Sequence, residues 1–130
     1  MILRPFVYEK FSVYLVRGDA KLKIGYYYRG RLLGELEETK NGFSYTSNID
    51  NEQYFMSSHI LTPSEYELWN SCKRVSKTLF SEFESLLKRC SRKDILETAG
   101  ISSTDSKWEA LVKLSKLEWN TPNTYVGQIL

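Results

Sequence analysis

The stretch of sequence that decides the fold is KLKIGYYYRGRLLGELEETKNGFSY, residues 21–45. Apolar and polar side chains alternate along residues 21–28, which is the pattern of a half-buried antiparallel strand. Two turn signals, Arg29-Gly30 and Asn41-Gly42, separate this segment from the next two. Asn-Gly is typical of a type I′ hairpin turn, because both central positions need a positive φ. The stretch therefore predicts three consecutive strands joined by tight turns.

The meander extends on both sides of this stretch. Residues 6–17 are rich in aromatic and β-branched side chains, which favours a further strand before it. Residues 53–56 are expected to add a short strand after it. We therefore predict an antiparallel β-meander of about four to five strands within a strand-rich region, residues 6–57.

At Thr62 the spacing of apolar residues changes from the two-residue period of a strand to that of a helix. Thr62 can cap a helix, Pro63 suits its first position and Glu65 completes a capping box. Apolar residues then recur at three- and four-residue steps, which is the pattern of an amphipathic helix. They are Trp69, Cys72, Val75, Leu79, Phe83, Leu86 and Cys90. One long helix is predicted here.

Two shorter helices are expected to follow. The first runs to Ala99 and ends at Gly100, which can take the left-handed position. The second begins near Ser103 or Thr104 and runs to about residue 118. The chain is thus predicted to be a single α+β domain, residues 1–130, in which three C-terminal helices (helical region 62–119) pack on one face of the meander. A short apolar tail, residues 121–130, completes it.

Composition sets the broad class of protein. The chain has 130 residues, of which 42% are hydrophobic, so one domain can bury a core without disulfides or metal. Cys72 and Cys90 would lie roughly 27 Å apart on one helix, which excludes a disulfide and suggests two buried thiols in a reducing compartment. The first residues lack a signal-peptide pattern and no apolar run has the length of a membrane span. We expect a cytoplasmic protein.

Signatures of catalysis are weak in the sequence. His59 is the only histidine, and no serine or cysteine nucleophile is paired with it by a known motif. The glycines fall at strand ends rather than in a phosphate-binding loop. We expect no enzyme activity, no catalytic residue, no metal site and no cofactor.

Protein–protein contact is the leading functional hypothesis. Tyr26, Tyr27 and Tyr28 cannot all face the core, because successive strand residues point to opposite sides. Together with Arg29 and Arg31 they form a set of side chains typical of interface anchors. We expect a small regulator or inhibitor of a larger protein partner. The tail, residues 125–130, is expected either to dock on its own domain or to pair with a partner or a second copy in a homodimer.

Nucleic-acid binding is the alternative. Residues 91–117, with Ala99-Gly100-Ile101-Ser102 as the turn, resemble a helix-turn-helix or winged-helix unit. That resemblance implies phosphate contacts from Lys107, Lys113 and Lys116, to which Lys21 and Lys23 add a basic and aromatic strand face. The net charge is only +2, and Asp105 and Glu109 would repel phosphate. A plain helical hairpin packed on the sheet is the interpretation that we favour for this segment.

A second resemblance concerns the first hairpins. Residues 23–46, from Lys-Ile-Gly-Tyr-Tyr-Tyr to Gly-Phe-Ser-Tyr-Thr, look like the start of the N-terminal subdomain of HipA-type toxin kinases. In that family this small domain contacts partners and carries out no phosphoryl transfer. The resemblance is confined to these residues, and it implies a binding role.

Overall fold

The computed structural model describes residues 22–69 and 72–129. Its centre is an antiparallel sheet of five strands in the order β4-β3-β2-β1-β5. The first three strands are β1 (Lys23–Tyr28), β2 (Arg31–Thr39) and β3 (Gly42–Ser47), which form a meander. The edges are β4 (Lys73–Ser76) and β5 (Tyr125–Gln128). The predicted strand over residues 6–17 lies outside the described residues.

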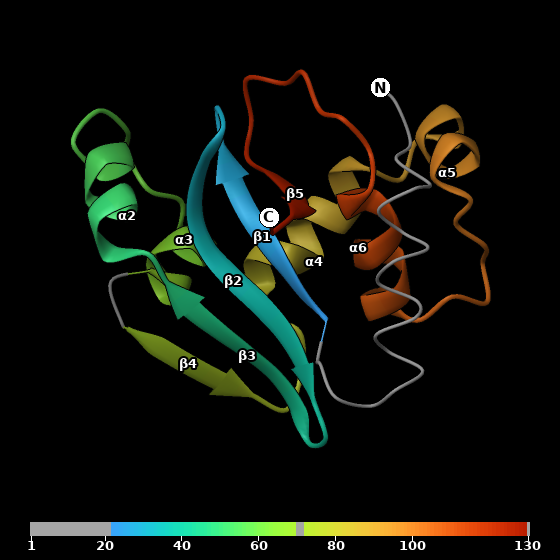
Figure 1. Cartoon of the computed structure of the whole chain (residues 1–130), viewed down its shortest axis with the longest axis horizontal. Helices are drawn as coiled ribbons and strands as arrows, with labels where there is room; N and C mark the ends of the chain where they lie inside the picture. The colour runs from blue at the N-terminus through green and yellow to red at the C-terminus, as the bar shows by residue number, and fades with distance from the viewer. Residues whose placement is uncertain (1–21, 70–71, 130) are drawn as a thin grey trace.

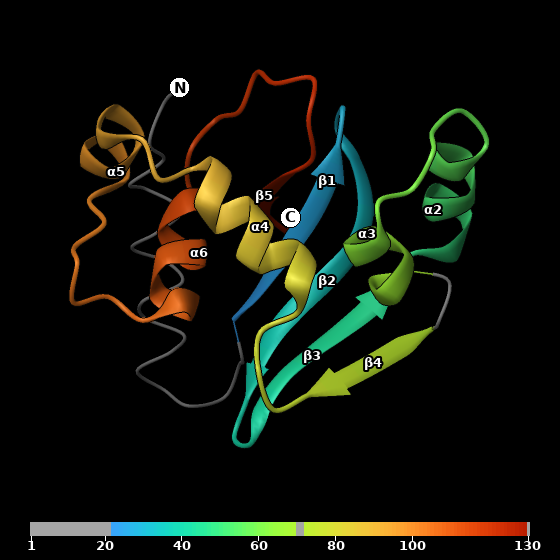
Figure 2. The same cartoon turned by 180° about the vertical axis from the view of Figure 1, so that it is seen from behind.

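Five helices accompany the sheet in the described part of the chain (Figures 1 and 2). α2 (Ile49–Met56) lies beside the start of β2, and α3 (Pro63–Leu68) and α4 (Ser81–Arg89) lie on the rear face of Figure 1. α6 (Lys107–Ser115) follows α5 (Lys93–Ala99) and packs next to β5. The predicted α+β class is confirmed, with five helices rather than three.

The type I′ turn expected at Asn41-Gly42 is wrong: Asn41 has no positive φ, and Gly42 already begins β3, where it pairs with Thr39. The β1–β2 turn has this geometry instead. Arg29 has φ 47° and Gly30 has φ 79°, so both central residues of the β1–β2 turn are left-handed, as a type I′ turn requires. Residues of β1 then alternate between the two faces, with Ile24 and Tyr26 buried on the side of the helices. The register shifts between Tyr26 and Tyr27, which marks a bulge in this pair of strands.

The hydrophobic core lies between the sheet and α4 and α6. Tyr26 and Tyr45 contribute the largest side chains from the strands, and both contact the ring of Phe83 on α4. Leu86 on α4 and Leu111 on α6 complete this layer. The ring of Tyr45 also crosses Gly34, where a Cβ would lie 2.2 Å from the ring carbon Cζ. Only glycine leaves room for this ring on β2.

The long helix predicted from Thr62 to Cys90 is wrong. The capping box of Thr62 and Glu65 is present, but it opens only the short helix α3, which ends at Leu68. The chain then continues as strand β4 and as a separate helix α4. Cys72 is consequently exposed rather than buried, whereas Cys90 is buried as expected, and both are free thiols.

Other element boundaries also differ from the expectations. Residues 53–56 belong to α2 rather than to a strand, because Asn48 caps a helix there by accepting a hydrogen bond from the Asn51 amide. α6 begins at Lys107, after a capping box of Ser106 and Glu109, and not near Ser103. The tail forms β5, which pairs antiparallel with β1. Within the described residues, no helix has the length and apolar character that a bilayer crossing requires.

Candidate functional site

The three consecutive tyrosines of β1 have different environments. Tyr26 is fully buried, and its hydroxyl donates to the carboxylate of Glu82. Burial raises the pKa of Tyr26 well above its usual value, so the phenol is neutral. Tyr28 is buried against Phe55 and lies edge-on to the ring of His59. These two side chains belong to the core and offer nothing to a partner.

Tyr27 lies on the opposite face of the sheet and is half-buried. Its ring stacks on that of Tyr125, with 5.6 Å between the centroids, and its hydroxyl donates to the Gln128 carbonyl over 2.8 Å. The ring lies over Gly25 on its own strand and over Gly127 on β5, where a Cβ would come within about 3 Å of it. Tyr27 is therefore held mainly by contacts with its own sheet.

Arg29 and Arg31 reach the surface at the β1–β2 turn. The Arg29 guanidinium lies 5.3 Å from the centre of the Tyr28 ring. The Arg31 guanidinium lies 3.9 Å from the centre of the ring of Tyr54 on α2. A guanidinium above an aromatic face is attracted by the ring electrons, so Arg31 and Tyr54 form one exposed unit.

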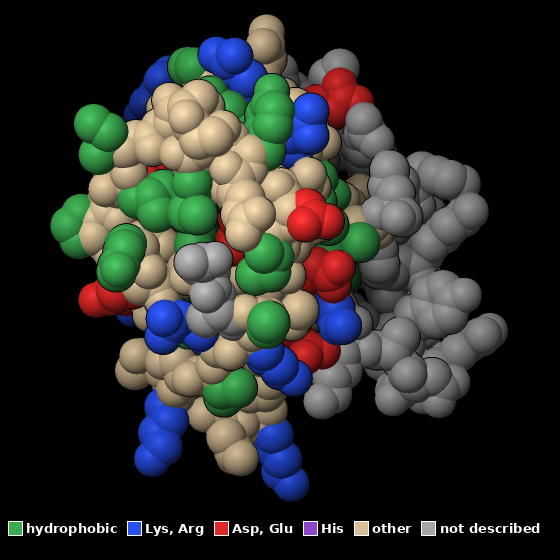
Figure 3. All heavy atoms as spheres, turned by 90° about the vertical axis from the view of Figure 1, so that its left-hand side faces the viewer, with side chains coloured by type: hydrophobic (Ala, Val, Ile, Leu, Met, Phe, Trp, Pro, Cys, Tyr) green, Lys and Arg blue, Asp and Glu red, His purple; other side chains and the backbone are tan. Residues whose placement is uncertain are grey.

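Four large apolar side chains are exposed in the described part of the chain, and the labelled elements that carry three of them, α2, α3 and β4, lie on the left-hand side of Figure 1. Tyr54 is 55% exposed, Ile60 98%, Tyr66 76% and Val75 72%. They come from α2, the segment after it, α3 and β4. Figure 3 shows this side: apolar side chains are spread over it, and basic side chains lie toward both its upper and its lower end.

Cations lie beside the exposed Val75, on β4 and directly after it. Lys73, Arg74 and Lys77 are exposed, and none forms an ion pair with another described residue. No carboxylate occurs between Cys72 and Phe80. We call the whole set the β4-side surface; it comprises Arg31, Tyr54, Ile60, Tyr66, Lys73, Arg74, Val75 and Lys77.

Of the five residues proposed to contact a protein, only Arg31 belongs to the β4-side surface. Tyr54, Tyr66 and Val75 were missed because the sequence pattern placed them in a strand region or on a long helix with a buried face. The run Lys-Arg-Val-Ser-Lys, residues 73–77, was the available signal: it holds three cations, a β-branched residue and no acid. That composition suits an exposed edge strand.

The lysines proposed for nucleic acid are mostly engaged within the domain. Lys107 pairs with Glu84 at 2.7 Å, and Lys113 pairs with Asp105 at 2.6 Å and also donates to the Gly100 carbonyl. Lys116 is buried, and burial together with nearby Lys113 lowers its pKa to about 8.

The connection between the two helices is also unlike the expected turn. Residues 100–106 join α5 to α6, whereas a helix-turn-helix usually has three or four residues there. Lys23, on the sheet, lies 4.0 Å from Glu35. Lys21 lies outside the described residues. These lysines therefore do not form one uninterrupted basic stripe.

The acidic and imidazole groups that could suggest catalysis have structural partners. Glu52 is buried and accepts from the Tyr45 hydroxyl over 3.2 Å. Nδ1 of His59 lies 3.0 Å from the Phe55 carbonyl, and its Nε2 lies 3.1 Å from the Tyr28 hydroxyl. No three His, Cys, Asp or Glu side chains of the described residues are grouped closely enough to hold a metal ion.

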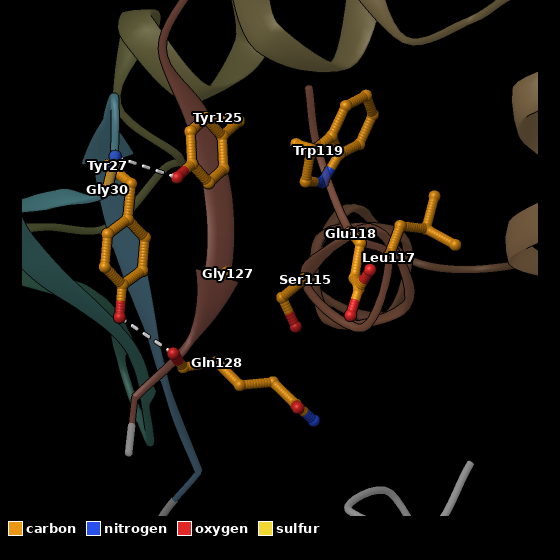
Figure 4. A pocket seen from close by; sticks show the side chains of 9 residues that line it. All are labelled: Tyr27, Gly30, Ser115, Leu117, Glu118, Trp119, Tyr125, Gly127 and Gln128. Carbon is orange, nitrogen blue, oxygen red and sulfur yellow. Dashed lines mark hydrogen bonds between the residues drawn. The ribbon is translucent and has the colours of Figure 1, made fainter. Parts of the chain in front are cut away.

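A hollow of about 420 Å³ lies between β5 and the end of α6 (Figure 4). Tyr27 and Tyr125 line one wall, and Trp119 and Glu118 lie on the opposite wall. The Trp119 indole donates to the Leu114 carbonyl over 3.0 Å, which fixes its ring. The volume falls in the range of small-molecule pockets. Its lining mixes polar and aromatic groups without favouring one reaction.

Comparison with known proteins adds no family to this description. No family model, no curated protein and no solved structure matches the chain.

Proposed function

We propose that this chain is a small, non-enzymatic binding protein that regulates or inhibits a larger protein in the cytoplasm by direct contact. The observation that carries the proposal is the β4-side surface. Tyr66 and Val75 are largely exposed, Val75 beside cations, and exposed apolar side chains rimmed by charge are typical of interaction sites. Arg31 stacked on Tyr54 supplies the residue types that often anchor an interface.

Nucleic-acid binding through residues 91–117 is the alternative use of the chain. Ion pairs of Lys107 and Lys113 and the burial of Lys116 leave few cations for phosphate. A titration with DNA and RNA at low salt tests this alternative. Binding that weakens steeply as salt rises, and that depends on Lys107 and Lys113, would favour it over a protein partner.

Site-specific cross-linking in the protein's own cells tests the proposed function. A photo-reactive residue replaces Tyr66 or Val75 on the β4-side surface in two variants. In a matched control it replaces Glu97, which is exposed on α5. We expect adducts of one discrete size from positions 66 and 75 and none from position 97, since only the first two would lie in the interface.

Absence of adducts at positions 66 and 75 would contradict the proposal. Adducts of equal yield from all three positions would do so as well, because they would indicate random collisions. The folded state of each variant is checked by its circular dichroism and its urea midpoint.

A further inference from the structure

The free edge of β4 is the part of the β4-side surface with the most definite chemistry. β4 lies at the end of the strand order and pairs with β3 alone (Figures 1 and 2). Three of its four residues are exposed. In an antiparallel pair, only some backbone groups of an edge strand point to its neighbour, and the others point outward. Among the described residues, no strand covers these outward groups.

The side chains of β4 alternate between the two faces of the sheet. Lys73 and Val75 pair with Thr46 and Ser44, which places them on the face opposite to the helices. Arg74 pairs with Tyr45, whose ring is in the core, so it lies on the helix-bearing side. A strand added beside β4 would meet a cation on each face and the apolar Val75 on one of them.

The charge of this edge favours one kind of occupant. Lys73, Arg74 and Lys77 form no ion pair with another described residue, and the segment 72–80 has no carboxylate. Along the chain the nearest acidic residues are Glu67 on α3 and Glu82, which is buried. An incoming strand with carboxylates opposite these cations would gain cross-strand attraction, while a basic strand would be repelled.

A second copy of the chain fits this edge poorly. Antiparallel pairing of two β4 strands would place the cations of residues 73 and 74 among those of the other copy, and like charges across strands are destabilising. Lysine on an edge strand deters pairing with strands of neutral or like charge. It does not deter an acidic strand, and the exposed Val75 offers that strand an apolar contact.

We propose that β4 binds an extended acidic segment of the partner, which adds to the sheet as a strand along the free edge. This inference rests on the proposed function and names the chemistry of the partner. Main-chain hydrogen bonds would supply affinity. Selection would come from carboxylates facing Lys73 and Arg74 and from an apolar side chain next to Val75.

Amide hydrogen exchange of the full chain tests strand addition. The probe is a short, end-blocked peptide of alternating glutamate and valine. Two controls are used: the same peptide with lysine in place of glutamate, and the acidic peptide with methylated backbone nitrogens along one edge. We expect exchange of the outward N–H groups in residues 73–76 to slow about tenfold when the acidic peptide is present at about ten times its dissociation constant. Neither control should have this effect.

Equal protection by the lysine peptide, or protection that survives backbone methylation, would overturn the inference. So would the absence of any change in residues 73–76, or a change confined to other residues. The variant with Lys73→Glu and Arg74→Glu should reverse the preference between the acidic and basic peptides, which a nonspecific effect would not do.

These outcomes are distinct from failure of the proposed function. If position 66 cross-links to a partner but the peptide leaves β4 unchanged, the partner binds the apolar side chains without adding a strand. If β4 accepts the acidic peptide but no adduct forms in cells, strand addition holds and the regulatory role fails.

Discussion

Glu82 is a buried carboxyl group at the start of α4 that joins three other parts of the fold. It accepts hydrogen bonds from the hydroxyl of Tyr26 on β1, from Ser64 on α3 at 2.9 Å and from Thr124 before β5 at 3.5 Å. Burial raises the pKa of Glu82, although the Tyr26 and Ser64 hydroxyls act in the opposite direction. The site therefore favours the protonated carboxyl while its hydroxyl partners stabilise the ionised one.

This conflict predicts how the stability of Glu82→Gln depends on pH. The unfolded carboxyl ionises at about pH 4.3, whereas the folded one keeps its proton to a higher pH. Between these two pH values the unfolded state binds fewer protons than the folded state, so the unfolding free energy of the wild type falls as pH rises. The side-chain amide of the variant does not ionise, so the variant lacks this pH dependence. We expect the unfolding free energy of the wild type minus that of the variant to fall between pH 4 and pH 7. The fall should be about 1.4 kcal/mol for each pH unit by which the folded pKa exceeds the unfolded one.

Urea unfolding at several pH values measures this difference. Tyr26→Phe is the companion variant, because it removes a hydroxyl that stabilises the carboxylate and should steepen the decline. A difference that grows with pH would mean that the folded state prefers ionised Glu82, contrary to the burial of its side chain.

Single residues also show where sequence patterns are informative. Alternation along residues 21–28 places Ile24, Tyr26 and Tyr28 on the buried side, and the structure agrees. A glycine inside a strand often marks a bulge, but the bulge of β1 lies between Tyr26 and Tyr27 and not at Gly25. The glycine instead makes room for the Tyr27 ring. A glycine in a strand indicates that another group packs closely against the backbone, but the sequence does not say which side chain that is.

At the scale of elements, the segment from Trp69 to Phe83 shows why the sequence misleads. Its apolar residues have helical spacing, and Trp69, Leu79 and Phe83 are indeed buried. They reach the core from separate elements, because residue 69 is already extended (ψ 165°) and β4 pairs with β3 instead of continuing α3. Pairing of β4 with β3 is a tertiary interaction that stabilises the strand, and the local spacing of apolar residues carries no information about it. The same error concealed the β4-side surface.

The helix start predicted at Thr62 is present, and the two capping boxes allow a second test. Thr62 and Ser106 each accept a hydrogen bond from the amide three residues later and belong to capping boxes. We expect Thr62→Ala and Ser106→Ala each to lower the unfolding free energy by about 1 kcal/mol in urea titrations, because a helix-end amide loses its partner.

Thr104→Ala is the matched control for these caps. Thr104 is exposed and bonds to the Ser102 hydroxyl rather than to a helix amide. Its substitution should therefore cost clearly less than that of Ser106. An equal loss of unfolding free energy at positions 104 and 106 would indicate that α6 starts before Lys107. The sequence pattern alone had placed that start near Ser103 or Thr104.

At the scale of the whole molecule, the surfaces are unequal. Helices cover one face of the sheet, as the change of period at Thr62 predicted (Figure 2). On the opposite face, Tyr27 is stacked on Tyr125 and Lys23 is close to Glu35. Exposed apolar side chains lie instead on α2, α3 and β4, and Lys73 and Arg74 on β4 form no ion pair with another described residue. Which edge is open depends on strand order, and the sequence pattern did not identify that order.

Charge reversal separates binding at this edge from folding. The variant with Lys73→Glu and Arg74→Glu changes exposed side chains without described ion-pair partners, so its unfolding free energy should stay within about 0.5 kcal/mol of the wild type. Its photo-adduct from position 66 should nevertheless be lost, because an acidic partner would be repelled. In the wild type, the adduct yield should fall as salt screens the attraction.

Lys88→Glu combined with Lys93→Glu is the matched control, since it changes the net charge equally at exposed positions on α4 and α5. This control should keep its adduct at position 66. Loss of the adduct in both variants would show that net charge alone governs association. Retention in both would show that the cations of β4 are not part of the interface. Only loss confined to the β4 variant assigns the partner's attraction to Lys73 and Arg74, and the urea midpoint of the same samples excludes unfolding as its cause.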